Sequence, residues 1–396
     1  MASRLYRSLG IALILAATAA GLACNEDAAG PAADDIAPAA VKIPVGPQVV
    51  TGEIGPGALY GLYLPDNWNG DLVVYAHGYD TGHVLPDAYP TNAALRDGLL
   101  SLGFAVAWSS YSQTQMAIED GVIRTRQVQS LFTSKFTRPE HTYLMGMSMG
   151  GAVAMELAQT NPERFDGVLS ECGLIGGVRF GVDYFFNVRV LFDYFYPGVV
   201  PGTAVEYVPG LDFWGVVAPA VTAAIMADPS GAMALAEVDQ IAIQYNDMGE
   251  LIQSIMFPLM FNTADWYVGD IAARAHGQFF DNSDVLYTGS SDDDALNAGV
   301  ARFTADRNAL NATERWYTPA GDLKLPVLTI HTSRDPIVPM LHEARFSDIV
   351  ASQGASDFLV QRTMNTFGHC AFTTAEELTA MTDLATWVKT GVRPGS

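Results

Sequence analysis

Apolar runs and stretches of helical periodicity alternate along the chain from about residue 49 onward. The runs 72–76 and 104–108 are continuously apolar, as is typical of parallel strands that are buried on both faces. Helical patterns follow them at 92–102 and 116–136. This alternation predicts an α/β fold in which a doubly wound, mostly parallel sheet carries helices on its faces.

The same pattern predicts the remaining elements of this domain. We expect strands at 59–64, 71–76, 103–108, 167–170, 326–330 and 358–361, with one more strand ending at Met147. We expect helices at 92–102, 116–136, 150–160 and 374–390. The short apolar segments are the strands, and the longer periodic ones are the helices.

The alternation stops between the strand at 167–170 and the one at 326–330. Residues 173–323 separate them, far more than the few residues that usually link such elements. Helical patterns at 214–227 and 249–261 lie within this stretch. We therefore expect an inserted, mainly helical domain.

Aromatic side chains crowd the start of the insert. They are Phe180, Tyr184, Phe185, Phe186, Phe192, Tyr194, Phe195 and Tyr196. They could form the core of the insert, or several could line an apolar substrate cleft beneath a lid. Both interpretations can hold, because the inner face of a lid is the roof of the pocket.

An acidic segment follows at 281–294. Its aspartates lack the glycine and the terminal glutamate of an EF-hand calcium loop, so we expect a solvated loop. The chain also has no C-x-x-C motif and no histidine cluster. We therefore expect neither a metal nor a cofactor.

The N-terminus has the layout of an export signal. Arg4 and Arg7 precede the apolar run 9–22, which is shorter than a membrane-spanning helix, and small residues lead up to Cys24. The sequence Gly21-Leu22-Ala23-Cys24 resembles the lipobox of bacterial lipoproteins, although that family prefers leucine where Gly21 stands. Lipidation at Cys24, with anchoring to a bacterial membrane, and simple secretion are the two alternatives.

The boundaries of the parts follow from these patterns. A signal peptide is expected at 1–23 and a disordered tether at 24–45, where Ala, Asp, Gly and Pro dominate. The core is expected at 46–172 and 324–396, and the insertion at 173–323. The net charge of −22 repels polyanions, so nucleic acid is not an expected partner.

Gly146-Met147-Ser148-Met149-Gly150 marks the junction between an apolar run and a helical stretch. A serine between two glycines at such a junction is typical of a nucleophile elbow, where the tight turn leaves no room for neighbouring side chains. Ser148 is therefore our candidate nucleophile.

A serine hydroxyl needs a base, and the base needs a third group to orient it. Among the seven histidines, His369 follows the last strand and precedes the C-terminal helix. Asp335 comes just after the strand at 326–330, and Pro336 favours an extended or turn conformation there. We expect His369 as the base and Asp335 as the acid.

The oxyanion of an acyl intermediate needs preorganised backbone N–H donors. One donor should be Met149, the residue after the nucleophile, and the other should come from the loop that follows an earlier strand. The strand at 71–76 runs into such a loop, and we select Tyr79 as the second donor. His77 is expected to brace this loop rather than to transfer protons.

These features together resemble the α/β-hydrolase superfamily over about residues 49–392, with the insert set aside. The resemblance rests on His77-Gly78, the elbow, Asp335-Pro336 and Gly368-His369 in the order of that family. It implies an eight-stranded, mostly parallel sheet, a triad of Ser148, Asp335 and His369, and a cap after the sixth strand. Within the superfamily the chain looks most like exported bacterial carboxylesterases and lipase-like or polyester-cleaving enzymes.

Cys172 and Cys370 remain outside the signal region, as a disulfide or as two buried free thiols. Tannases and feruloyl esterases carry one cysteine directly before the serine and another directly after the histidine, joined as a bridge. This chain has Cys370 after His369 but Met147 before Ser148. Cys172 could substitute as the partner of Cys370 and hold the His369 loop in place.

Three functions compete at this point. The first is hydrolysis of small-molecule or polymeric esters through an acyl-enzyme on Ser148. The second is a peptidase or amidase of the same fold, for which Asp292–Asp294 could anchor a substrate amino group. The third is a binding protein on a hydrolase scaffold, which would require a broken set of catalytic residues.

Overall fold

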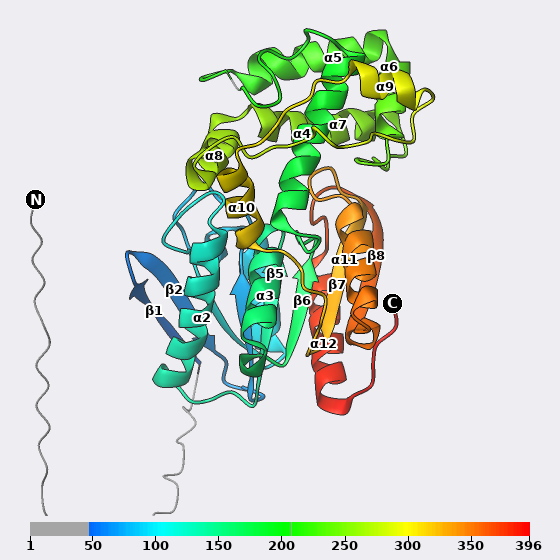
Figure 1. Cartoon of the computed structure of the whole chain (residues 1–396). Coiled ribbons are helices and arrows are strands. Elements are labelled where there is room, and N and C mark those ends of the chain that lie inside the picture. The colour runs from blue at the N-terminus through cyan, green and yellow to red at the C-terminus, as the bar shows by residue number, and fades with distance from the viewer. Residues whose placement is uncertain (1–46, 207) are drawn as a thin grey trace, which may run out of the picture. The chain divides into compact units, whose positions relative to one another are not determined.

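A computed structural model of the chain describes residues 47–206 and 208–396. The expected signal peptide, the tether and Cys24 lie outside these residues. The described part contains a sheet with helices on both faces and a helical cap at one end of the strands (Figure 1).

The sheet has eight strands in the order β1-β2-β4-β3-β5-β6-β7-β8. Their bounds are β1 Gln48–Ile54, β2 Ala58–Leu64, β3 Asp71–Ala76, β4 Ala105–Ser109, β5 His141–Met147, β6 Gly167–Glu171, β7 Val327–Arg334 and β8 Leu359–Phe367. β2 is antiparallel to both of its neighbours, and from β4 to β8 every pair is parallel. The predicted fold class, a mostly parallel α/β sheet, is confirmed.

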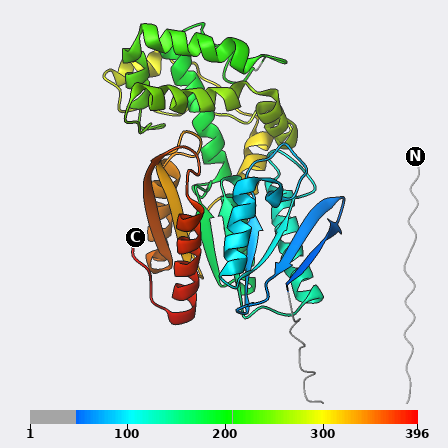
Figure 2. The same ribbon diagram turned by 180° about the vertical axis from the view of Figure 1, so that it is seen from behind.

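Helices cover both faces of the sheet. The core helices are α1 Pro90–Ser101, α2 Ile118–Lys135, α3 Met149–Thr160, α11 Leu341–Ser352 and α12 Thr374–Thr390. α1 and α12 lie side by side on one face, and α2, α3 and α11 lie on the other (Figures 1 and 2). The doubly wound arrangement follows from these two helical layers.

Alternate side chains of the central strands enter two separate hydrophobic cores. Leu72 and Val74 of β3 pack with α2 and α3, whereas Val73 and Tyr75 pack with α1 and α12. Successive side chains of a strand point to opposite faces of the sheet, so a continuous apolar run presents apolar side chains on both faces. Helices must therefore cover both faces.

The insert between β6 and β7 is mainly helical. It contains α4 Val178–Phe195, α5 Ala218–Ala227, α6 Pro229–Ala236, α7 Met248–Thr263, α8 Asp270–Ala275, α9 Asp293–Gly299 and α10 Arg307–Trp316. The helix expected at 214–227 begins as a π-helical turn at Phe213–Val217. The sequence pattern did not separate α6, α8, α9 and α10 from the loops around them.

The aromatic start of the insert is α4, and its side chains serve both of the expected roles. Phe186 and Phe192 are buried within the cap, where Phe186 packs against Phe279 and Phe280. Phe185 lines the cavity that contains Ser148 and stacks on Phe261 with ring centroids 4.8 Å apart.

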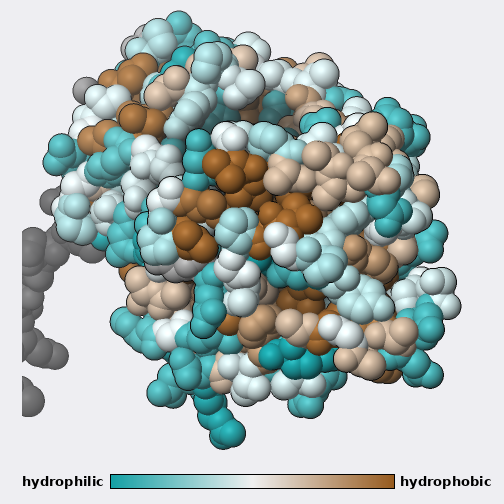
Figure 3. All heavy atoms as spheres, turned by 90° about the horizontal axis from the view of Figure 1, so that it is seen from above, coloured by the Kyte–Doolittle hydropathy of each residue, from teal (hydrophilic) through white to brown (hydrophobic). Residues whose placement is uncertain are grey.

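The outer side of the cap exposes several apolar side chains, among them Trp214, Val216 and Met226. Figure 3, which views the molecule from the cap side, shows apolar surface gathered on that face. Within the described residues, no single helix combines the length and apolarity of a membrane span. The segments Phe213–Ala227 and Pro229–Ala236, which meet at 98°, pass that test only when taken together.

α12 buries a pair of carboxyl groups against the sheet. Glu171, at the carboxyl end of β6, is fully buried, and neither of its carboxyl oxygens has a hydrogen-bond partner among the described residues. Burial raises the pKa of Glu171 well above its usual range, and the charge of Glu377 on α12 raises it further. Burial likewise raises the pKa of Glu377 to about 7.

This pair makes the stability of the fold dependent on pH. A carboxyl whose pKa is raised in the folded state keeps its proton there after the unfolded chain has lost it, so stability is lost as the pH rises above about 4.5. Glu171→Gln removes the ionisable group. Each unit by which folding raises the pKa of Glu171 corresponds to about 1.4 kcal/mol of unfolding free energy lost at high pH, and the variant avoids this loss. We expect this variant to raise the thermal midpoint at pH 8 and to change it less at pH 5, as measured by circular dichroism.

The control is Glu163→Gln, which removes the same charge from an exposed position. It should have similar, small effects at both pH values. A Glu171→Gln midpoint that is unchanged or lower at pH 8 would contradict the expectation.

Candidate active site

The turn between β5 and α3 holds Ser148 in a strained conformation. Its backbone has φ 56° and ψ −122°, a region that side-chain-bearing residues rarely adopt. A Cβ at Gly146 would overlap the carbonyl of Gly150, and a Cβ at Gly150 would overlap the carbonyl of Ala76 on β3. The two glycines are therefore required by backbone packing, as the elbow motif predicts.

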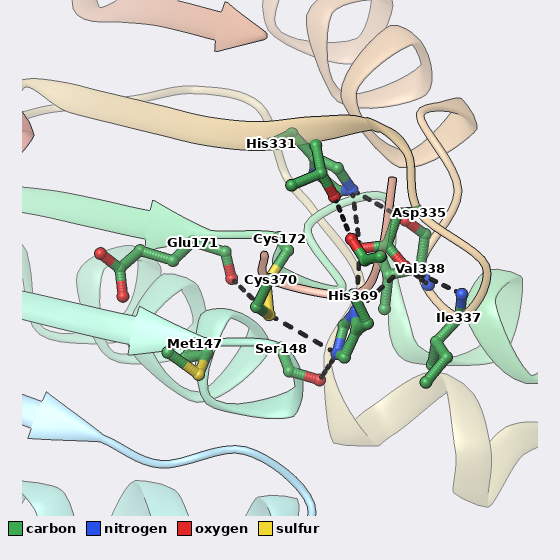
Figure 4. The surroundings of a disulfide bond; sticks show 12 residues. Met147, Ser148, Glu171, Cys172, His331, Asp335, Ile337, Val338, His369 and Cys370 are labelled. Carbon is green, nitrogen blue, oxygen red and sulfur yellow. Dashed lines mark hydrogen bonds and ion pairs between the residues drawn. A yellow bond between two sulfur atoms is a disulfide. The ribbon is translucent and has the colours of Figure 1, made fainter. Parts of the chain in front are cut away.

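Ser148, His369 and Asp335 lie in line at the carboxyl edge of the sheet (Figure 4). His369 Nε2 is 2.8 Å from Ser148 Oγ. His369 Nδ1 is 2.8 Å and 3.0 Å from the two carboxylate oxygens of Asp335. The structure thus brings together the three residues that the sequence selected from distant parts of the chain.

Asp335 is fixed by its surroundings. Its Oδ1 accepts hydrogen bonds from the backbone N–H groups of Ile337 and Val338, at 2.8 Å and 2.9 Å. The carboxylate is nearly fully buried, and His331 Nε2 lies 3.7 Å from Oδ2. These contacts aim the carboxylate at His369 and leave it little freedom to rotate.

His331 is a supporting residue that the sequence interpretation missed. Its Nδ1 lies 3.1 Å from Glu343 Oε1, and its Nε2 lies 2.7 Å from the carbonyl of Val338. Burial alone would lower the pKa of His331, but the hydrogen bond to Glu343 and the charges of Glu343 and Asp335 outweigh it and raise the pKa. Its position four residues before Asp335 was the only sequence signal.

His77 lies in the loop after β3, and its contacts fit a bracing role. Its ring stacks on Tyr111 with centroids 3.8 Å apart, and its Nδ1 lies 2.8 Å from the carbonyl of Gly78. Burial lowers its pKa, which favours the neutral ring. Of the histidines in the described residues, only His369 reaches the hydroxyl of Ser148.

The loop after β3 approaches the nucleophile closely. A Cβ at Gly78 would lie 3.2 Å from Ser148 Cβ, so the backbone at this point is adjacent to the elbow. Tyr79 and Met149 both line the cavity that contains Ser148. Within the described residues, neither backbone N–H donates a hydrogen bond to a protein acceptor.

Cys172 and Cys370 are joined by a disulfide, with Cα atoms 5.4 Å apart. Both residues have positive φ, 44° and 49°. Cys370 Sγ lies 3.6 Å from His369 Nε2, so the bridge fastens the His369 loop to the end of β6. Because the two sulfur atoms are bonded to each other, the cluster of Cys172, His369 and Cys370 does not offer free thiolates to a metal.

The cavity above Ser148 has a volume of about 550 Å³ and is lined by residues of both the cap and the core. The cap contributes Leu174, Phe185, Phe261 and Tyr267. The core contributes polar residues from the N-terminal ends of α1 and α12, including Asn92, Thr374 and Glu377. A cavity of this size and composition is typical of a small-molecule site.

Polar contacts tie the cap to the core around the cavity. The hydroxyl of Tyr79 donates to the carbonyl of Trp266 at 2.8 Å, and Arg274 donates to the carbonyl of Thr114 at 2.9 Å. Arg334, the neighbour of Asp335, pairs with Glu250 of α7 at 2.9 Å. These cap contacts join residues far apart in the sequence, and no local pattern could have identified them.

Comparison with known proteins gives a family match and a distant relative. Residues 123–236, which include Ser148 but neither Asp335 nor His369, match the family described as "Putative esterase". An o-phthalyl amidase from Xanthobacter agilis is 23% identical over 402 residues, covering 86% of this chain and 87% of the relative.

Two solved structures from Aspergillus oryzae resemble this one. An esterase aligns with a TM-score of 0.48 and 16% identity, covering 88% of this chain and 80% of that chain. Feruloyl esterase B aligns with a TM-score of 0.45 and the same identity and coverage.

The strand order places β3 beside β5, which brings the loop after β3 to the elbow. Ser148 lies between β5 and α3, and His369 follows β8. This arrangement is that of the α/β-hydrolase fold, and the esterase family match over residues 123–236 agrees with it.

Proposed function

We propose that this hydrolase is a serine esterase that cleaves carboxylic esters through an acyl-enzyme on Ser148. The observation that carries the proposal is the 2.8 Å contact between Ser148 Oγ and His369 Nε2, with Asp335 on the other ring nitrogen. A nucleophile, a base and an orienting acid in this order match the requirements of acyl transfer. The family match over residues 123–236 supports the same reaction class.

In the proposed mechanism, His369 takes the proton of Ser148 as Oγ attacks the ester carbonyl. Asp335 accepts a hydrogen bond from Nδ1–H, which keeps Nε2 unprotonated and stabilises the imidazolium that forms. The backbone N–H groups of Tyr79 and Met149 stabilise the oxyanion. His369 then gives its proton to the departing alcohol, which leaves the acyl group on Ser148. His369 next takes a proton from water as the water attacks the acyl-enzyme, and it returns that proton to Ser148 Oγ as the acid is released.

The lining of the cavity supports a proposal for the substrate class. Its aromatic and apolar cap side suits an ester with an apolar or aromatic part, and the volume accommodates a small molecule or one unit of a polymer. We also propose, on the basis of the N-terminal sequence, that the protein is exported and either lipidated at Cys24 or secreted.

Amide hydrolysis is the second candidate, because the o-phthalyl amidase is similar over most of its length. The expectation that Asp292–Asp294 would anchor a substrate amino group is wrong. Asp292 and Asp293 accept hydrogen bonds from Ala295 and Ser290 at the start of α9, and none of the three aspartates lines the cavity. Asp292 is the N-cap of α9, a role that aspartate commonly takes.

Replacing the nucleophile tests the proposal directly. Ser148→Ala removes the attacking oxygen, and we expect kcat/KM for 4-nitrophenyl butyrate to fall by about 10³-fold or more. A fluorophosphonate probe should label the wild type at Ser148 and leave this variant unlabelled. Ser134→Ala, at an exposed position on α2, is the matched control and should behave as the wild type.

Wild-type turnover by Ser148→Ala would reject the acyl-enzyme mechanism. An unlabelled wild type without esterase or amidase activity would instead support a non-catalytic binding protein.

Matched substrates separate the two hydrolase functions. We expect kcat/KM for a phenyl ester to exceed that for the anilide of the same acid, because the proposed site acts on esters and the anilide is the less reactive bond. Phthalyl and benzoyl pairs, each measured with the purified enzyme, provide the comparison. A higher kcat/KM for the anilides would favour the amidase.

The disulfide should matter for both activity and stability. Cys172→Ala/Cys370→Ala frees the His369 loop from β6, and we expect a lower kcat and a loss of about 2–5 kcal/mol in stability. Dithiothreitol should lower the thermal midpoint of the wild type but not that of the double variant. Equal midpoints for the reduced and unreduced wild type would show that the bridge does not hold the fold.

A further inference from the structure

Glu377 is a buried acidic residue in the wall of the cavity. It is 7% exposed, it lines the cavity that contains Ser148, and its carboxyl forms no hydrogen bond or ion pair within the described residues. Its neighbour Glu376 differs, because Glu376 Oε2 accepts hydrogen bonds from the N–H and the hydroxyl of Thr373 in the capping box of α12. The capping of α12 therefore accounts for the position of the Glu376 carboxylate, but not for the burial of the Glu377 carboxyl.

Two other acidic side chains lie at or near the cavity. Glu171 lies buried nearby with both carboxyl oxygens unpartnered, and Asp80 lines the cavity. Asp80 accepts hydrogen bonds from Gly82 N–H and the Tyr89 hydroxyl, which are neutral donors. Among the described residues that line the cavity, none is lysine or arginine.

An unpaired carboxylate in such a place is costly, because it loses its hydration without gaining a counter-charge. Burial raises the pKa of Glu377 to about 7, so the free protein can hold it as the neutral acid. A positively charged group that entered the cavity would stabilise the ionised carboxylate.

Aromatic rings line the same side of the cavity. Tyr75, Tyr89 and Phe372 come from β3, the start of α1 and the loop before α12. Aromatic faces attract ammonium groups, and quaternary ammonium ligands are commonly held by several rings together with a carboxylate. The core side of the cavity thus combines a carboxyl group with aromatic rings, the two kinds of group that bind organic cations.

We propose that the core side of the cavity, between the N-terminal ends of α1 and α12, is a subsite for a positively charged group of the substrate. Glu377 supplies the counter-charge, and the aromatic rings contact the methyl or methylene groups of the cation. The substrate would be an ester that carries an ammonium or quaternary ammonium group. This inference rests on the proposed esterase function for its reaction, but not for the binding of the cation.

Equilibrium binding to the Ser148→Ala protein tests the subsite without turnover. Phenyltrimethylammonium, benzyl alcohol and benzoate serve as cationic, neutral and anionic probes in isothermal titration calorimetry. We expect the cation to bind most tightly. Adding Glu377→Gln should lower the affinity for the cation by about tenfold or more and should change the affinity for benzyl alcohol far less.

Ser148→Ala/Glu163→Gln is the matched control, since it removes one negative charge from the exposed position and should keep the affinity for the cation. Glu377→Met gives a second charge-free variant, and circular dichroism establishes that each variant is folded. Equal affinity for the cation with and without the Glu377 carboxyl, or tighter binding of benzoate, would overturn the proposal.

Turnover provides the second readout. The ratio of kcat/KM for a choline ester to that for the 3,3-dimethylbutyl ester of the same acid should exceed one and should fall in Glu377→Gln. Hydrolysis of neutral esters without cation binding would reject the subsite and leave the esterase intact. Cation binding by a protein that cleaves no ester would reject the esterase and leave the subsite intact.

Discussion

The active site depends on one backbone contact, where Gly150 at the start of α3 meets the peptide between Ala76 and His77. No side-chain carbon fits there, so the elbow and the loop after β3 approach more closely than two ordinary segments can. This contact holds Ser148 at its strained φ and sets the loop of Gly78 and Tyr79 beside it. The pairing of β5 in the sheet and the hydrogen bond from Ser148 N–H to the Glu171 carbonyl stabilise the strained backbone.

Parallel strands bring the residues of the proposed triad to the same place. Ser148, Asp335 and His369 each follow the carboxyl end of a strand, and these ends share one edge of the sheet. The cap is also inserted at this edge, between β6 and β7, so it covers the proposed triad without interrupting the strands. The sheet thereby positions the proposed triad, while the cap forms part of the wall of the cavity above it.

The parts of the site that the sequence predicted are those set by local backbone geometry. Gly146 and Gly150 are demanded by the turn itself, and Asp335 and His369 follow recognisable strands. Glu377 was not predictable, because the first turn of a helix ordinarily exposes its acidic residues and only the packing of α12 on β6 buries this one. Asp292 was misread for the opposite reason, since a local helix cap resembles a binding cluster.

The bridge between Cys172 and Cys370 spans 198 positions, and the entire cap lies between its two ends. A protease that cut a cap loop would therefore leave the Ser148 half and the His369 half of the protein covalently linked. Under oxidising conditions, a nick in the cap would not release the segment that carries His369. The covalent connection between the proposed nucleophile and the proposed base thereby becomes independent of an unbroken cap backbone.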